Sequence, residues 1–118
     1  MYTQDEIKPV EIHFHIDETI KLRFERIGTL GLVINEIVSN AFKYAFTEVD
    51  QGFLRIDIQQ MGQKIVVEIE DNGPGIVSEI KSRSNLGMRL IRILSEQMGA
   101  IYRLEQGRGI KHLISFNN

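Results

Sequence analysis

The stretch from Leu30 to Phe46, LGLVINEIVSNAFKYAF, decides the fold, because it predicts one long helix with two different faces. Residues three, four and seven positions apart share one face of a helix. Here Glu36, Asn40 and Lys43 form a polar stripe with that spacing. The broad apolar face beside the stripe consists of Leu30, Val33, Ile34, Ile37, Val38, Ala41 and Ala45. We therefore predict a helix that packs on a sheet, with a stripe that is either a solvated surface or a binding surface.

The three side chains of the stripe suit phosphate chemistry as a set. An amide oxygen such as that of Asn40 is a hard ligand for Mg²⁺. The ammonium of Lys43 is a compact partner for phosphate. The carboxylate of Glu36 can orient a nucleophile or a water molecule.

The size and composition of the chain exclude several classes of protein. Its 118 residues fit one domain, and 42% hydrophobic and 25% charged residues are an ordinary globular balance. A net charge of −2 gives no basic field for nucleic acid, and the absence of cysteine excludes disulfides and thiolate sites. We expect no signal peptide, because the start of the sequence is polar and acidic, and no membrane-spanning segment, because no apolar run approaches the roughly 20 residues that span a bilayer. We expect a cytoplasmic protein with no nucleic-acid partner and no direct membrane contact.

The N-terminal part of the chain predicts a lead-in, a strand and a short ambiguous segment before the long helix. Residues 1–9 form the lead-in, and residues 10–118 form the domain. Residues 10–16 alternate between apolar and polar, which predicts a half-buried strand with His13 and His15 on its polar side. Residues 19–26 are mixed and suggest a second short strand. Gly28 then breaks the pattern, and Thr29 is predicted to cap the helix.

Two hairpins and a second helix are predicted after the long helix. Residues 53–59 and 65–70 alternate around a turn and predict an antiparallel pair. Residues 87–98 predict a helix that ends at Gly99, and residues 100–105 and 110–116 predict the last hairpin. The order strand, helix, hairpin, loop, helix, hairpin predicts an α+β two-layer sandwich, with a mixed, mainly antiparallel sheet and the helices on one face.

The loop EDNGPGI, residues 70–76, is the most informative connection. Asp71 ends a buried strand, where its carboxylate requires hydrogen-bond donors such as an adenine amino group or a bound water molecule. Gly73 and Gly75 permit positive φ and let a flat ring or a phosphate approach the backbone, while Pro74 stiffens the bend. The alternative is a tight turn with an Asx motif.

The start of the second helix is a candidate phosphate site. Asn85, Leu86, Gly87 and Met88 open this helix, whose first N–H groups point toward any bound anion. The segment before it carries Lys81 and Arg83. It is either a lid that orders over a nucleotide or an ordinary surface loop.

Three stretches in this order, INEIVSNAFKYAF, EDNGPGI and NLGMRLIRILSEQMGA, resemble the N, G1 and G2 boxes of the GHKL ATPase superfamily. More narrowly, they resemble the catalytic ATP-binding domain of a bacterial sensor histidine kinase, of the subgroup with the second type of dimerisation domain. The resemblance covers residues 10–116. It implies the GHKL (Bergerat) sandwich, ATP and Mg²⁺ as cofactors, and transfer of the γ-phosphate to a histidine on a separate dimerisation domain. A response regulator is the implied next partner.

The resemblance also implies a role for each matching residue. Asn40 is expected to ligate Mg²⁺, and Glu36 to polarise the attacking group or a metal-bound water. Asp71 is expected to accept a hydrogen bond from the adenine amino group. The remaining implied contacts are Lys43 to phosphate, Tyr44 beside the adenine, Gly73 and Gly75 as lid hinges, and Leu86 and Gly87 near the phosphates.

The sequence departs from the family pattern at several points, and these keep two alternatives open. The G2 region retains only Gly87 among its usual glycines, and Ile110 replaces a common threonine after Gly109. His13, His15 and His112 lie on predicted strands rather than in a phosphoacceptor helix, so the acceptor is expected on another part of a longer kinase. The alternatives are a serine kinase of the anti-sigma-factor type and a degenerate ATP-binding interaction module.

Overall fold

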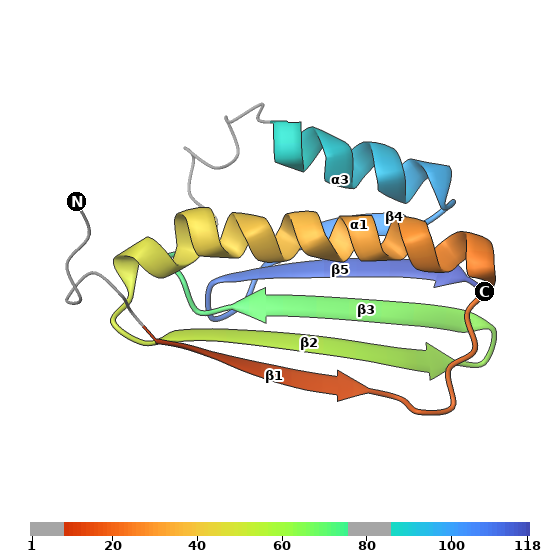
Figure 1. Cartoon of the computed structure of the whole chain (residues 1–118), viewed down its shortest axis with the longest axis horizontal. Coiled ribbons are helices and arrows are strands. Elements are labelled where there is room, and N and C mark those ends of the chain that lie inside the picture. The colour runs from red at the N-terminus through yellow and green to blue at the C-terminus, as the bar shows by residue number, and fades with distance from the viewer. Residues whose placement is uncertain (1–8, 76–85) are drawn as a thin grey trace.

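The computed structural model describes residues 9–75 and 86–118, which form a five-stranded sheet with two long helices packed on one of its faces (Figure 1). The elements, in chain order, are β1 (Val10–Ile16), α1 (Phe24–Asn40), β2 (Gly52–Met61), β3 (Lys64–Asp71), α3 (Leu86–Gln97), β4 (Ile101–Gln106) and β5 (Ile110–Asn117). The strand order is β1-β2-β3-β5-β4. β1 runs parallel to β2, and every other pair is antiparallel. The predicted α+β two-layer sandwich with a mixed sheet is confirmed.

The core lies between the helices and the three central strands. Alternate residues of β2, β3 and β5 point toward the helices, and the register places Ile56 opposite Ile69 and Val67 opposite Ile114. The side chains that meet there and are almost fully buried are Val33, Ile37, Leu54, Ile65, Val67, Ile69, Ile91 and Ile114. The apolar face predicted for the long helix is therefore the face that packs on the sheet.

Helix α1 begins earlier than the sequence pattern predicts. The expected break at Gly28, the cap at Thr29 and the short strand before them are wrong, since the helix is continuous from Phe24. Arg26 stabilises the first turn, because its guanidinium donates to the carbonyl of Met98 and lies 5.5 Å from the ring centroid of Phe116. These tertiary contacts outweigh the low helix propensity of Gly28.

The same helix ends differently from the prediction of a uniform helix to Phe46. The α-helical part stops at Asn40, and Ala41–Ala45 form a π-helical turn followed by a 3-10 turn, Phe46–Glu48. Single π-helical turns are frequent at functional sites. This one places Ala41, Tyr44 and Ala45 along the cavity described below.

Strand β1 is present as predicted, but its expected burial is wrong. Ile12, Phe14 and Ile16 share the helix-facing side of the sheet with Leu54 and its neighbours, yet they are 42%, 66% and 51% exposed. The reason is position: β1 is the edge strand, and α3 lies at the opposite side of the molecule (Figure 1). Within residues 9–75 and 86–118, neither helix combines the length and apolarity needed to cross a membrane.

Candidate functional site

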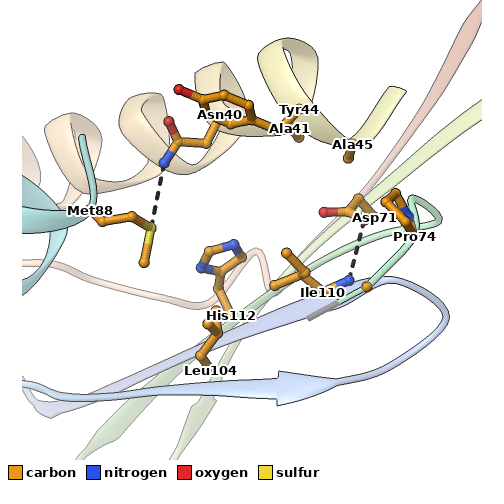
Figure 2. A pocket seen from close by; sticks show the side chains of 11 residues that line it. Asn40, Ala41, Tyr44, Ala45, Asp71, Pro74, Met88, Leu104, Ile110 and His112 are labelled. Carbon is orange, nitrogen blue, oxygen red and sulfur yellow. Dashed lines mark hydrogen bonds between the residues drawn. The ribbon is translucent and has the colours of Figure 1, made fainter. Parts of the chain in front are cut away.

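A cavity lies between the end of α1, the loop after β3, the start of α3 and the hairpin of β4 and β5 (Figure 2). The space between its walls is about 530 Å³, a volume that includes open solvent at its mouth. Its lining residues are Asn40, Ala41, Tyr44, Ala45, Asp71, Pro74, Gly75, Met88, Leu104, Ile110 and His112. Residues from the segments INEIVSNAFKYAF and EDNGPGI, which are distant in sequence, therefore line the same cavity.

Asp71 is the acidic group of this cavity. It ends β3 with an exposed fraction of only 4%, and its Oδ1 accepts hydrogen bonds from the backbone N–H of Gly73 at 2.8 Å and of Ile110 at 3.2 Å. Burial raises the pKa of this carboxyl above its ordinary value, and the two N–H donors offset part of that effect. Oδ2 has no hydrogen-bond partner among the described residues, so this oxygen is available to a ligand.

Asp71 forms an Asx turn and also lines the cavity. Its bond to Gly73 two residues further on is an Asx turn, which was the alternative to a binding role. The same bond fixes the carboxylate so that it points into the cavity (Figure 2). The turn therefore orients the residue that faces the cavity.

The glycines around Asp71 leave room for close backbone approach. A Cβ on Gly73 would lie 2.6 Å from the Cβ of Ala45, and a Cβ on Gly109 would collide with Oδ1 of Asp71. Of the two glycines that permit positive φ, Gly75 adopts it, at +89°, whereas Gly73 does not. Gly73 is required for space, because a Cβ there would collide with Ala45.

Asn40 and Glu36 meet the start of α3. A Cβ on Gly87 would lie 3.1 Å from Oδ1 of Asn40 and 3.1 Å from Oε2 of Glu36. The side-chain N–H of Asn40 donates to the sulfur of Met88 at 3.7 Å. Because Gly87 has no side chain, the N-terminus of α3 can lie close to Asn40 and Glu36.

The other predicted residues divide between the cavity and the surface. Tyr44 lines the cavity, whereas Lys43 is exposed and is not part of the lining. The side chain of Leu86 and the predicted lid, with Lys81 and Arg83, lie outside the described residues. The polar stripe therefore contributes Asn40 to the cavity wall and Glu36 to the contact with Gly87.

His112 is a cavity residue that the sequence interpretation missed. It lies on β5, is 6% exposed, and bonds through Nδ1 to the hydroxyl of Tyr102 at 2.8 Å. Burial lowers the pKa of its imidazole to about 4. The signal was present, because the alternation along β5 places His112 on the same face as Ile114 and Phe116.

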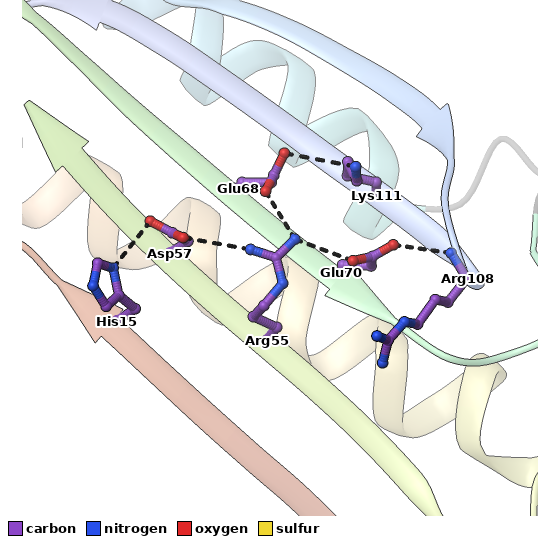
Figure 3. A network of polar contacts seen from close by, with 7 residues as sticks. All are labelled: His15, Arg55, Asp57, Glu68, Glu70, Arg108 and Lys111. Atoms are coloured by element: carbon purple, nitrogen blue, oxygen red, sulfur yellow. Dashed lines mark hydrogen bonds and ion pairs between the residues drawn. The ribbon is translucent and has the colours of Figure 1, made fainter. Parts of the chain in front are cut away.

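A polar network on the opposite face of the sheet supports the loop that carries Ile110 (Figure 3). Glu70 is 8% exposed and accepts hydrogen bonds from the backbone N–H of Arg108 at 2.9 Å and from Arg55 at 3.1 Å. Arg55 also bonds to Glu68 at 2.8 Å. Glu70 therefore holds the turn between β4 and β5 against β3, directly beside Asp71.

Residues 25–116 match the model of the family described as histidine kinase-, DNA gyrase B-, and HSP90-like ATPases. The chain therefore belongs to this family, and the two-layer sandwich described above agrees with that membership. Within this family, the similar proteins are histidine kinases. The prediction of a GHKL catalytic domain of a sensor histidine kinase is confirmed, because the similar proteins below are histidine kinases.

Two sequence relatives illustrate the match. The blue-light-activated histidine kinase 2 of Erythrobacter litoralis is 30% identical over 93 residues, which are 76% of this chain and 27% of that protein. The sensor histidine kinase BtsS of Escherichia coli K12 is 30% identical over 114 residues, which cover 83% of this chain and 20% of BtsS. The chain thus spans a minor part of the length of these relatives.

Solved structures agree with the fold. The histidine kinase domain of the blue-light-activated kinase EL346 of Erythrobacter litoralis superposes with a TM-score of 0.82 at 27% identity, over 92% of this chain and 51% of that one. The catalytic domain of the histidine kinase ThkA superposes with a TM-score of 0.75 at 19% identity, over 92% of this chain and 78% of that one. The second similarity concerns the fold alone.

Proposed function

We propose that residues 10–118 form the ATP- and Mg²⁺-binding catalytic domain of a longer kinase, and that this domain acts in the cytoplasm. The domain transfers the γ-phosphate of ATP to a histidine on a separate dimerisation domain, from which a response regulator takes it. Phosphoryl transfer requires mainly positioning and charge neutralisation from the protein. The chain's own residues accordingly bind and orient the nucleotide.

The observation that carries the proposal is the arrangement of Asp71. Two backbone N–H groups hold Oδ1, and Oδ2 has no partner within the described part of the chain. Oδ2 borders the cavity and is left free by the two backbone donors, so it can accept a hydrogen bond from a ligand that carries an N–H₂ group. The exocyclic amino group of adenine is such a donor, whereas guanine has a carbonyl at the same position.

Asn40 and Glu36, which lie on α1 beside the start of α3, fit a nucleotide-bound Mg²⁺. The described residues contain no group of three or more His, Cys, Asp or Glu side chains that could hold a metal by themselves. Mg²⁺ in such sites is held by few protein ligands together with substrate phosphates and water. We assign Oδ1 of Asn40 as the protein ligand, and Glu36 as the group that orients the attacking nucleophile or a water molecule. Bound Mg²⁺ supplies neutralisation of the phosphate charge.

The remaining contacts belong to the same proposal. Tyr44, which lines the cavity, flanks the adenine, while the backbone at Leu86 and Gly87 meets the phosphates at the helix N-terminus. We assign Lys43 as a phosphate contact because its exposed side chain follows Asn40 along the polar stripe of the helix. Gly73 and Gly75 act as the hinge of the lid.

The substitution Asp71→Asn tests the base contact with little change of shape. The asparagine oxygen will keep the two backbone N–H bonds, so the new NH₂ group faces the adenine amino group, donor against donor. We expect the Kd for Mg-ATP, measured by isothermal titration calorimetry, to rise by about 10-fold or more. The matched control is Asp50→Asn, the same change at an exposed loop position, which leaves the Kd unchanged. An unchanged Kd in Asp71→Asn would refute the base contact.

A transfer assay tests the proposed substrate. The chain is incubated with labelled ATP, Mg²⁺ and a separately purified dimerisation domain from the parent kinase. We expect labelled protein that loses its phosphate in acid and keeps it in base, as phosphohistidine does. Acid-stable label would favour the serine kinase alternative, and no label with intact ATP binding would favour the interaction module.

A further inference from the structure

His112 has one ring nitrogen that the protein uses and one that it does not. Nδ1 bonds to the Tyr102 hydroxyl at 2.8 Å, and the two rings stack with centroids 5.9 Å apart. Nε2 has no hydrogen-bond partner among the described residues; His112 as a whole is 6% exposed, and this nitrogen is not among the fully enclosed polar atoms, so it borders the open space of the cavity. Figure 2 shows the imidazole projecting from β5 into the cavity, between Met88 and Ile110. The free nitrogen therefore belongs to the wall of the nucleotide cavity.

The bond to Tyr102 defines which nitrogen carries the proton. Burial raises the pKa of the Tyr102 phenol, so its hydroxyl keeps its hydrogen, and the imidazole is neutral because burial lowers its pKa to about 4. Among the described residues, the hydrogen-bond partner of the Tyr102 hydroxyl is Nδ1 of His112, at 2.8 Å. The arrangement that satisfies the hydroxyl places the imidazole hydrogen on Nε2. His112 thus presents an N–H donor to the cavity.

The surroundings of this donor favour an uncharged ring as its partner. The lining of the cavity includes the apolar residues Ala41, Met88, Leu104 and Ile110, and it includes no cationic side chain among the described residues. A phosphate would be poorly solvated there, whereas a flat base would bury its faces against apolar groups. A base that displaces water from this part of the cavity must offer an acceptor to the donor, because a donor left without one in the complex would cost free energy.

The position of His112 fits a second contact to the same base as Asp71. Asp71 bonds to the N–H of Ile110, and His112 lies two residues further along β5 with its side chain on the same face. Two residues of a strand span roughly 7 Å. A two-ring base that meets Asp71 at one edge therefore extends toward His112.

We propose that His112 is a specificity-determining residue of the nucleotide site, whose Nε2–H donates to an acceptor nitrogen of the purine ring. This inference rests on the proposed function, since it adds a second point of recognition to the amino-group contact at Asp71. Tyr102 is the positioning residue, because its hydroxyl fixes the tautomer that makes Nε2 the donor.

A purine analogue series tests the contact. The Kd values of ATP and of 1-deaza-, 3-deaza- and 7-deaza-ATP are measured for the wild-type chain, for His112→Phe, and for His15→Phe as an exposed control on β1. We expect one analogue to bind the wild type and the control about 10-fold more weakly than ATP. His112→Phe is expected to bind ATP about 10-fold more weakly and to lose the discrimination against that analogue. Equal affinities of the wild type for all four nucleotides, or unchanged discrimination in His112→Phe, would overturn the proposal.

A measurement on the wild type covers the case in which His112→Phe does not fold. With ¹⁵N-labelled histidine, the Nε2–H resonance of His112 is expected to shift on saturation with ATP and to keep its free position with the critical analogue. An Nε2–H signal that ignores bound ATP would contradict the contact. The two proposals fail differently: without the proposed function ATP does not bind at all, whereas without this contact ATP binds and the analogues bind equally.

Discussion

At the scale of single residues, His112 links the cavity to the pH dependence of folding. Burial lowers the pKa of its imidazole from 6.5 to about 4 in the folded chain. Below pH 6.5 the unfolded chain therefore binds a proton that the folded chain does not accept. Stability contributed by this neutral histidine is complete above pH 6.5 and is lost as the pH falls toward 4.

We predict that this effect lowers the free energy of unfolding by about 3 kcal/mol between pH 7 and pH 4. Other groups also titrate in acid, and Asp71, whose pKa burial raises, acts in the opposite direction because its folded form takes up a proton first. The measurement is therefore the difference between urea unfolding curves of the wild type and His112→Phe across this range. Parallel pH profiles of the two proteins would show that His112 is not buried in its neutral form.

At the scale of elements, the contact of β3 with the turn between β4 and β5 positions the carboxylate of Asp71. Glu70 makes this contact, and its pKa is the balance of two effects. Burial alone would raise the pKa of Glu70. The Arg108 backbone N–H, the Arg55 side chain and the charge of Lys111 together lower it by more, so the pKa lies below its ordinary value. The ionised carboxylate is therefore the form that holds the turn (Figure 3).

Replacing Glu70 with alanine is expected to loosen this turn. The backbone N–H of Arg108 and the guanidinium of Arg55 lose their acceptor, which predicts a loss of about 1–3 kcal/mol in the free energy of unfolding. The Kd for ATP should also rise, because the same turn brings the N–H of Ile110 to Asp71. Glu105→Ala is the matched control, since the side chain of Glu105 is 44% exposed and forms an ion pair with Arg103 at 3.6 Å. Equal effects of the two substitutions, by chemical denaturation and calorimetry, would contradict the role of Glu70.

The elements also show how far local sequence patterns determine this fold. Period-two alternation predicted the hairpin of β2 and β3 closely, because each residue there faces either the core or solvent. The start of α1 at Phe24 depends on contacts of Arg26 with Met98 and Phe116, which are distant in sequence. A local hydrophobic pattern cannot predict contacts between residues so distant in sequence.

The residues of the candidate site also include some that local motifs predict and one that depends on contacts distant in sequence. Asp71, Asn40 and Tyr44 were predicted because they belong to motifs with recognisable spacing, and they do line one cavity. His112 was missed because its role depends on Tyr102 from the neighbouring strand and on burial under α1 and α3. A lone histidine on an alternating strand carries no sign of either.

At the scale of the whole molecule, the position of the helices decides which apolar residues stabilise the fold. β3 pairs with β5 instead of β4, so the centre of the sheet lies under α1 and α3 while β1 remains at an edge. Phe116, at the end of β5, is 2% exposed, and Phe14, in the middle of β1, is 66% exposed. Both are strand phenylalanines on the helix-facing side of the sheet, so they form a matched pair.

Alanine substitutions at these two phenylalanines test where the core ends. Phe116→Ala removes a ring packed in the core and beneath Arg26, and it should lower the free energy of unfolding by about 3–5 kcal/mol. Phe14→Ala removes a ring that α1 and α3 leave exposed, and it should change stability by less than about 1 kcal/mol. Urea unfolding of both variants, followed by circular dichroism, measures the difference. A loss at Phe14 as large as that at Phe116 would mean that the edge strand is covered in solution, and that the two-layer packing seen here is incomplete on that side.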